Sequence, residues 1–143
     1  MGVFAVIPAR GGSKGITNKN MHLLNGVPLL EYTINACKNT KYIDQFAIST
    51  DSEVIIQYCN SLGVNHISRP AHIALDDSPT LSSIQHAYFT SNVFINKSSS
   101  DFVLTLQPTS PLRKSHHIDE AIELFNRHPS ADSLVSCNNC PHN

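Results

Sequence analysis

A loop near the N-terminus carries the residues whose types and spacing best suit chemistry. Residues 7–20 read IPARGGSKGITNKN; the glycines are Gly11, Gly12 and Gly15, and the cations are Arg10, Lys14 and Lys19. Glycine lets the backbone turn tightly and approach a ligand closely, and successive backbone N–H groups can form a concave anion site. Guanidinium and ammonium groups add charge-assisted hydrogen bonds to phosphate oxygens. The segment therefore predicts a polyphosphate-binding loop, and the alternative is a glycine-rich turn with solvated cations.

The spacing of these glycines excludes two common phosphate-binding motifs. The loop has neither the P-loop pattern, in which Gly-Lys and a Ser or Thr follow a first glycine at a fixed distance, nor the dinucleotide pattern G-x-G-x-x-G. It does follow an apolar run at residues 3–7, and open α/β sheets bind ligands beyond the carboxyl ends of their strands. We therefore expect a ligand-binding loop of another kind.

Alternating strands and helices are expected to position this loop. Runs of apolar and β-branched residues predict five strands, at residues 3–7, 46–50, 64–67, 102–106 and 133–137. Helical spacing predicts helices between them, beginning near Pro28, Ser52, Ser78 and Ser115. This alternation is typical of an α/β, three-layer fold with a mostly parallel sheet and helices on both faces, Rossmann-like in outline. We expect one nucleotide-binding domain over residues 1–143.

Finer expectations concern caps, buried faces and the order of strands. Either Asp51 or Ser52 is expected to cap the second helix, and Ser78 and Ser115 the third and fourth. Residues expected on inner helix faces are Val54, Ile55, Tyr58, Leu62, Leu81, Ile84, Ala87 and Tyr88. The unbroken apolar run at 102–106 predicts a central strand, and the polar stretch 96–100 is expected to be exposed.

Three polar loops should meet where the parallel strands end. They span residues 10–20, 69–80 and 107–113, and their candidate binding residues are Arg10, Lys19, Asn20, Arg69, Ser78, Thr80 and Gln107. Arginine and lysine can neutralise phosphates, and the amides offer both donors and acceptors for a sugar or a base. Each residue alone has an ordinary structural explanation, such as a cap, a surface cation or a turn. Their convergence on one edge is what favours a nucleotide site.

Composition narrows the class of protein. The chain has 143 residues, 41% of them hydrophobic, and a formal net charge of −1, which argues against a nucleic-acid partner because such a partner requires a basic face. No apolar run has membrane-spanning length and no leader peptide is recognisable at the N-terminus. We therefore expect a cytoplasmic globular protein with no membrane contact.

Cysteine, histidine and aspartate give weaker signals. Cys37 and Cys59 fall in expected helices and are interpreted as small core residues. Cys137 and Cys140 form a C-x-x-C pair that could be half of a zinc site or a redox pair, but no second ligand pair has suitable spacing. The adjacent aspartates at 76–77 are a weak magnesium signal, Asp51 is interpreted as a cap rather than a ligand, and no Ser/His/Asp set is evident.

Taken together, four segments resemble the acylneuraminate cytidylyltransferase family, the CMP–sialic acid synthetases and their legionaminic and pseudaminic acid relatives. The segments are IPARGGSKGITNKN, STD at 49–51, RPAHIALDDSPT and QPTSPLR. The resemblance implies a nucleotide-diphospho-sugar transferase-like fold. It also implies a reaction in which CTP and a nonulosonic acid give the CMP-sugar and pyrophosphate, with Mg2+ as cofactor and a role in surface polysaccharide synthesis.

Site roles follow from the same resemblance. It implies that Arg10 and Lys19 are catalytic and hold the triphosphate, together with the loop residues Gly11, Gly12 and Ser13. It implies that Asn20 binds the nucleotide and that Arg69, Ser78 and Thr80 complete the cytidine site. Gln107 is expected at the boundary with the sugar acid. The family's metal ligands are expected outside these 143 residues, and the full-length enzyme is expected to be a homodimer.

The chain departs from the family in two ways. Thr17 stands where the family usually has proline, and the chain ends at Asn143, which we interpret as a C-terminal truncation that could leave it inactive. The particular nonulosonic acid therefore stays open. One alternative is a CMP-Kdo-type synthetase, whose first loop usually lacks the Lys19-Asn20 pair. Another is a non-catalytic nucleotide-binding or assembly module.

Overall fold

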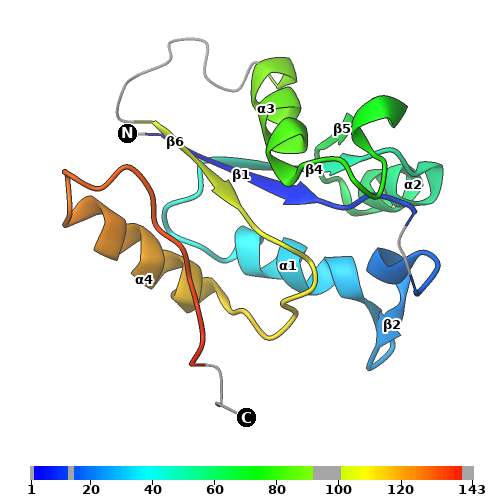
Figure 1. Ribbon diagram of the computed structural model, residues 1–143. Helices are drawn as coiled ribbons and strands as arrows, with labels where there is room; N and C mark the ends of the chain where they lie inside the picture. Colours follow the sequence, from blue (N-terminus) through cyan, green and yellow to red (C-terminus); the bar gives the residue numbers. More distant parts are fainter. Residues whose placement is uncertain (1, 13–14, 92–100, 140–143) are drawn as a thin grey trace.

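A four-stranded parallel sheet forms the centre of the molecule. The computed structural model describes residues 2–12, 15–91 and 101–139. The strands are β1 (Val3–Pro8), β4 (Gln45–Thr50), β5 (His66–Ser68) and β6 (Phe102–Thr105), in the spatial order β5-β4-β1-β6 (Figure 1). All three strand pairings are parallel. The predicted parallel α/β architecture is therefore confirmed.

Helices cover both faces of this sheet. They are α1 (Leu29–Lys38), α2 (Glu53–Leu62), α3 (Thr80–Thr90) and α4 (Ser115–Asn126). Figure 1 shows α3 on one face and α1 and α4 on the other, and α2 joins α1 and α4 because its buried residues pack in the same core cluster. The result is the three-layer arrangement that the alternating pattern predicts.

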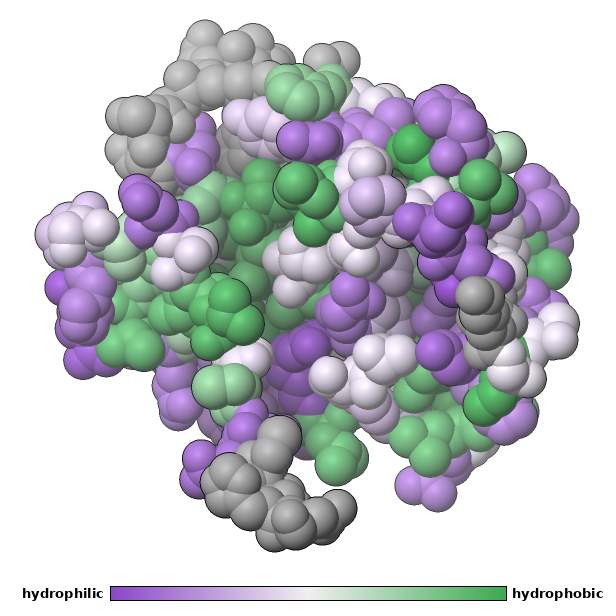
Figure 2. Space-filling model, in the orientation of Figure 1, coloured by the Kyte–Doolittle hydropathy of each residue, from purple (hydrophilic) through white to green (hydrophobic). Residues whose placement is uncertain are grey.

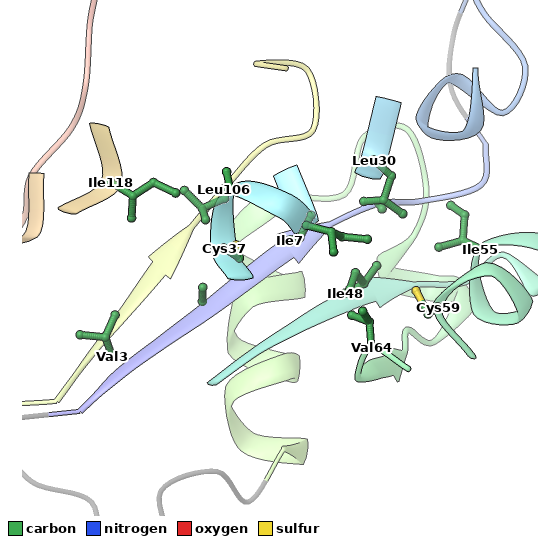
Figure 3. Close-up of a cluster of buried hydrophobic side chains, with 14 of the residues drawn as sticks. Val3, Ile7, Leu30, Cys37, Ile48, Ile55, Cys59, Val64, Leu106 and Ile118 are labelled. Carbon is green, nitrogen blue, oxygen red and sulfur yellow. The ribbon is translucent and has the colours of Figure 1, made fainter. Parts of the chain in front are cut away.

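The core consists of two clusters, one on each side of β1. Alternate strand residues point to opposite faces, so Val3, Ala5 and Ile7 enter the larger cluster with α1, α2 and α4 (Figure 3). Phe4 and Val6 enter the smaller cluster, where Ala87 of α3 covers them. Complete burial of a side chain such as Phe4 or Ile7 contributes about 1.5–3 kcal/mol. The central strand is thus held from both sides, and its carboxyl end is a rigid base for the loop that follows.

Two expectations about strands are wrong. Residues 132–139 contain neither helix nor strand, and Val135 is 83% exposed. Polar neighbours at 136, 138 and 139 leave too little apolar surface to bury a strand there. Among the described strands, β6 lies at the edge of the sheet and not in its centre. Its apolar run reflects cover on both faces, since Phe102 and Leu104 pack on one core cluster and Val103 on the other. Figure 2 shows apolar surface between α3 and α4, where β6 lies.

Helix starts and helix faces differ in detail from expectation. Ser52 caps α2, its Oγ accepting a hydrogen bond from the Ile55 N–H, so Asp51 is not the cap. The N-cap of α3 is Pro79 and that of α4 is Lys114, so Ser78 and Ser115 do not cap. Val54 and Leu81, expected inside, are 53% and 61% exposed. Helical spacing locates a stripe, but its outermost members lie beyond the surface that the sheet covers.

A short hairpin between the first loop and α1 escaped the sequence analysis. Strand β2 (Leu23–Leu24) pairs antiparallel with β3 (Val27–Pro28). Asn25 and Gly26 both have positive φ at its turn, the conformation that favours Asn-Gly in tight hairpins. The hairpin follows the short 3-10 helix η1 (Lys19–Met21), and a second one, η2 (Ala71–Ile73), lies before α3. The hairpin therefore connects the segment that carries Lys19 and Asn20 to α1.

Other expectations have plain outcomes. Cys37 and Cys59 are buried free thiols, as predicted, and burial raises the pKa of Cys37 to about 12. Cys137 is exposed, whereas Cys140 and the polar stretch 96–100 lie outside the described residues. Across the described ranges, no helix has the length and apolar character needed to cross a membrane.

Candidate functional site

A cavity of about 220 Å³ opens at the carboxyl ends of the parallel strands. Its lining comes from the three loops that the sequence analysis singles out and from the start of α3. The lining residues are Pro8, Arg10, Lys19, Asn20, Arg69, Leu75, Asp76, Ser78, Thr80, Ser83, Gln107, Pro108 and Thr109. The structure thus brings seven of the ten predicted site residues onto one surface.

Strand register explains this convergence. Pro8 of β1 pairs with Ser49 of β4, and Thr50 of β4 pairs with Ser68 of β5. Because the strands are parallel and in register at these ends, the residues that follow them leave the sheet at the same edge. Arg10 and Arg69 therefore reach the cavity from two separate strand ends.

Arg69 is the most deeply placed cation of the cavity. The residue is only 8% exposed, and its guanidinium donates to Ser49 through Nε to Oγ at 3.2 Å and through Nη2 to the carbonyl oxygen at 2.9 Å. Among the described residues no carboxylate forms a salt bridge with it. Burial lowers the pKa of Arg69, while the nearby charge of Asp51 acts in the opposite direction. A buried cation held only by neutral acceptors creates a strong local preference for an anion.

Arg10 lies at the mouth of the cavity and does have a partner. Its Nη1 contacts the Asp76 carboxylate in a salt bridge, with the two side chains 28% and 43% exposed. Asp76 belongs to the loop that follows β5, so the ion pair joins two of the three loops across the opening. An anion that binds Arg10 has to compete with this carboxylate.

Lys19 and Asn20 come from η1. Lys19 is half-buried and lines the cavity. Asn20 is 7% exposed, and its Nδ2 donates to the Arg10 carbonyl oxygen at 3.1 Å. The amide of Asn20 thus holds the backbone of the glycine-rich loop, and the residue also lines the cavity.

Ser78 and Thr80 approach from the start of α3. The Ser78 Oγ accepts from the Leu75 N–H at 3.1 Å and donates to the His72 carbonyl oxygen at 3.5 Å. The hydroxyl therefore braces its own loop, which is why it does not cap the helix. Thr80 is the first residue of α3, where unpaired backbone N–H groups favour an anion.

Two described residues predicted for the site, Gly11 and Gly12, do not line the cavity. Gly11 donates its N–H to Asp51 Oδ1 at 2.8 Å, pointing away toward the β4–α2 junction. Gly12 is exposed, and Ser13 lies outside the described residues. Gln107 does line the cavity and is exposed.

Six lining residues were not predicted to bind. They are Pro8, Leu75, Asp76, Ser83, Pro108 and Thr109. Ser83 could have been found, because it lies three residues after Thr80 and so on the same face of a helix. Asp76 was considered only as a magnesium ligand, and its pairing with Arg10 depends on a contact between loops 66 residues apart in sequence.

The described residues offer no ready metal centre. Within them, no group of three or more His, Cys, Asp or Glu side chains could hold a metal ion. Asp76 is the one carboxylate among the lining residues, and it already pairs with Arg10. These residues do not fit a resident metal ion.

The chain is similar to known proteins over most of its length. The family model described as cytidylyltransferase matches residues 4–140. An N-acylneuraminate cytidylyltransferase of Escherichia coli is 38% identical over 134 residues, which are 94% of this chain and 30% of that protein. The CMP-N,N'-diacetyllegionaminic acid synthase of Legionella pneumophila is 37% identical over 128 residues, covering 87% of this chain and 53% of that protein. The chain therefore spans only part of the length of these relatives.

A solved structure shares the fold at low sequence identity. The CMP:2-keto-3-deoxy-manno-octonic acid synthetase complexed with CTP superposes with a TM-score of 0.74 and 16% identity, covering 91% of this chain and 49% of that one. At such identity the likeness concerns the fold alone. The match of the family model over nearly all residues goes further and confirms the resemblance seen in the sequence: this chain belongs to the cytidylyltransferase family.

Proposed function

We propose that this chain provides the CTP site of an enzyme that transfers CMP from CTP to a nonulosonic acid and releases pyrophosphate. The observation that carries the proposal is the buried guanidinium of Arg69, which faces the cavity with no carboxylate partner among the described residues. Arg10 and Lys19 add two further cations to the same lining. A polyphosphate supplies the negative charge that this arrangement favours.

The proposed reaction needs positioning and charge stabilisation more than a protein nucleophile. The anomeric hydroxyl oxygen of the sugar acid attacks the α-phosphorus and its proton passes to solvent, the bond from that phosphorus to the bridging oxygen breaks, and pyrophosphate leaves with the bonding electrons. Negative charge grows on the leaving phosphates. In our proposal Arg10 and Lys19 stabilise that charge, while Arg69, Thr80 and Asn20 hold the nucleotide and Gln107 lies toward the sugar acid.

In our proposal, Mg2+ binds together with the phosphates of the nucleotide. Mg2+ is commonly bound by one or two carboxylates together with substrate phosphates. The described residues do not fit a resident ion, because Asp76, the one carboxylate among the lining residues, already pairs with Arg10. Proposed in the same way, from the family resemblance, are a cytoplasmic location, a homodimer and a role in surface polysaccharide synthesis.

Isothermal titration tests the nucleotide assignment. We expect the chain to bind CTP in the presence of Mg2+, weakly but measurably, and to bind ATP at least several-fold less tightly. Equal affinity for ATP and CTP would refute the cytidine assignment. Release of pyrophosphate from CTP and N-acetylneuraminate by the full-length protein would support the transferase, and its absence would favour a nucleotide-binding module.

The sugar acid is the second point to test. Relatives that are 37–38% identical are named for N-acylneuraminate and N,N'-diacetyllegionaminate, which favours a nine-carbon acid. A panel of acceptors that contains N-acetylneuraminate, a legionaminic acid and 3-deoxy-manno-octulosonate separates the possibilities. Turnover of the eight-carbon acid alone would replace our proposal by the CMP-Kdo-type alternative.

A further inference from the structure

We infer that Asp51 is a positioning residue, which fixes the glycine-rich loop so that Arg10 faces the cavity. This inference rests on the proposed function and assigns a role to a residue outside the cavity lining. Asp51 follows directly after β4 and is exposed. Its Oδ1 accepts the hydrogen bond of the Gly11 N–H at 2.8 Å, across 40 residues of sequence. The carboxylate therefore acts on the loop through its backbone.

The backbone on either side of Arg10 is held by three contacts. The Ala9 N–H donates to the Ser49 carbonyl oxygen at 2.9 Å, the Arg10 carbonyl oxygen accepts from Asn20 Nδ2 at 3.1 Å, and the Gly11 N–H donates to Asp51. Three consecutive residues are thus tied down, two of them to the β4 end and one to Asn20 at the other end of the loop. The Arg10 carbonyl and the Gly11 N–H belong to the same peptide unit, so the unit that follows Arg10 is held at both of its polar groups, and the Ala9 contact holds the chain just before Arg10. The Arg10 side chain therefore leaves a restrained backbone.

Close packing shows that the loop lies directly on the β4–α2 junction. A Cβ atom placed on Gly11 would lie 2.8 Å from the Ser52 Cβ and 3.2 Å from its Oγ. Real side chains do not approach so closely, so glycine is needed here for space. The Ser52 Oγ is itself occupied as the cap of α2, which limits its freedom to move aside.

The same junction also holds the second arginine of the cavity. The guanidinium of Arg69 donates twice to Ser49, two residues before Asp51. Residues 49–52 contribute nothing to the cavity lining, yet they contact both the Arg10 loop and Arg69. This junction therefore contacts both the backbone of the Arg10 loop and the guanidinium of Arg69.

Charge gives a way to separate positioning from electrostatics. A carboxylate near a triphosphate site opposes binding of the anion, whereas its hydrogen bond to Gly11 favours the binding conformation. The two effects have opposite signs. Asparagine keeps an acceptor oxygen at the same place and removes the charge, so Asp51→Asn preserves the proposed role while Asp51→Ala abolishes it.

The test combines nucleotide affinity with backbone protection. We expect Asp51→Ala to weaken CTP binding about tenfold, a change equivalent to about 1.4 kcal/mol, and Asp51→Asn to bind at least as tightly as the wild type. Glu53→Ala is the matched control, because it removes an exposed carboxylate two residues away, in the first turn of α2, and should leave affinity within twofold. Asp51→Ala with wild-type affinity, or Asp51→Asn as weak as Asp51→Ala, would overturn the inference.

Amide hydrogen exchange in the nucleotide-free chain tests the inference independently of CTP. The Gly11 amide should exchange at least several-fold faster in Asp51→Ala than in the wild type, and at nearly the wild-type rate in Asp51→Asn. Unchanged exchange in Asp51→Ala would overturn the positioning role even if CTP binds. If the wild type fails to bind CTP, the proposed function is refuted. If the variants nevertheless differ in Gly11 exchange as expected, the contact between Asp51 and the loop is still established.

Discussion

The two sides of the cavity present their arginines in opposite states. On the β1 side, Arg10 is partly exposed and already paired with Asp76. On the β5 side, Arg69 is 8% exposed, and among the described residues its guanidinium donates to a serine hydroxyl and a backbone carbonyl. Within the described part of the chain, Arg10 therefore has a carboxylate in a salt bridge before any ligand arrives, whereas Arg69 has none.

This difference separates two kinds of contribution to binding. An anion that reaches Arg69 gains a new ionic contact in a place of low dielectric, where such contacts are strong. An anion that reaches Arg10 only replaces Asp76, so its gain is the difference between two ion pairs near water. We expect Arg69 to contribute more to ligand affinity than Arg10, because a ligand at Arg10 has to replace Asp76.

The largest expected effect comes from removing the buried cation. Arg69→Ala should weaken CTP binding about 10- to 100-fold, since hydrogen bonds to charged groups contribute about 1.5–3 kcal/mol. Titration calorimetry measures the loss, and Arg127→Ala, which removes an exposed cation at the end of α4, is the control. Where Arg69→Ala folds poorly, Arg69→Lys keeps the charge without the planar donor pair and should still bind several-fold more weakly. Wild-type affinity in Arg69→Lys would show that charge alone suffices.

A smaller loss is expected on the opposite side. Arg10→Ala should weaken CTP binding only about three- to tenfold by the same titration, because the wild-type protein first has to break an exposed ion pair of about 0.2–1 kcal/mol. The comparison between the two arginines fails if Arg10→Ala loses more affinity than Arg69→Ala.

Removing the carboxylate of Asp76, which competes for Arg10, should strengthen CTP binding. Asp76→Asn is expected to bind CTP about two- to fivefold more tightly, since Arg10 no longer has a charged partner to leave. Asp77→Asn is the matched control, because Asp77 is the neighbouring exposed carboxylate and does not line the cavity. Weaker binding in Asp76→Asn would mean that Asp76 orients Arg10 for the ligand and does not compete with it.

The smallest expected effect is the response of these variants to salt. The Debye length falls from about 10 Å at 0.1 M to about 3 Å at 1 M ionic strength, so the advantage of Asp76→Asn over wild type should shrink to less than twofold at high salt. The deficit of Arg69→Ala should persist more fully, because buried groups are screened less. Parallel titrations at the two salt concentrations measure both.

The sheet and its helices could be predicted because their signals are local. The apolar patterns of β1, β4, α1 and α2 show which residues are buried, and they do so whichever element packs against them. The strand expected at 133–137 failed because a strand also needs a partner, and the sequence does not show which edge is available. The hairpin at Asn25-Gly26 was missed although its turn residues are a strong signal.

The candidate site also has features that could be predicted from the sequence and features that could not. Loops that end at the carboxyl edge of a parallel sheet must meet, so Arg10, Arg69 and Gln107 could be expected together from topology. Contacts between loops could not be foreseen. The pairing of Arg10 with Asp76, and the acceptance of the Gly11 N–H by Asp51, depend on loop paths that no periodicity encodes. Of the two cap candidates for α2, Ser52 is confirmed, whereas the Asp51 carboxylate accepts the Gly11 N–H.

The burial of Arg69 also makes the stability of the fold depend on the concentration of an anionic ligand. A ligand that neutralises this charge binds the folded chain and not the unfolded one, so it stabilises the fold by about 2.7 kcal/mol at a concentration a hundred times its Kd. Folding and nucleotide binding are then linked equilibria. In a cell, the nucleotide concentration would determine how long this chain survives unfolding and proteolysis as well as how often its site is filled.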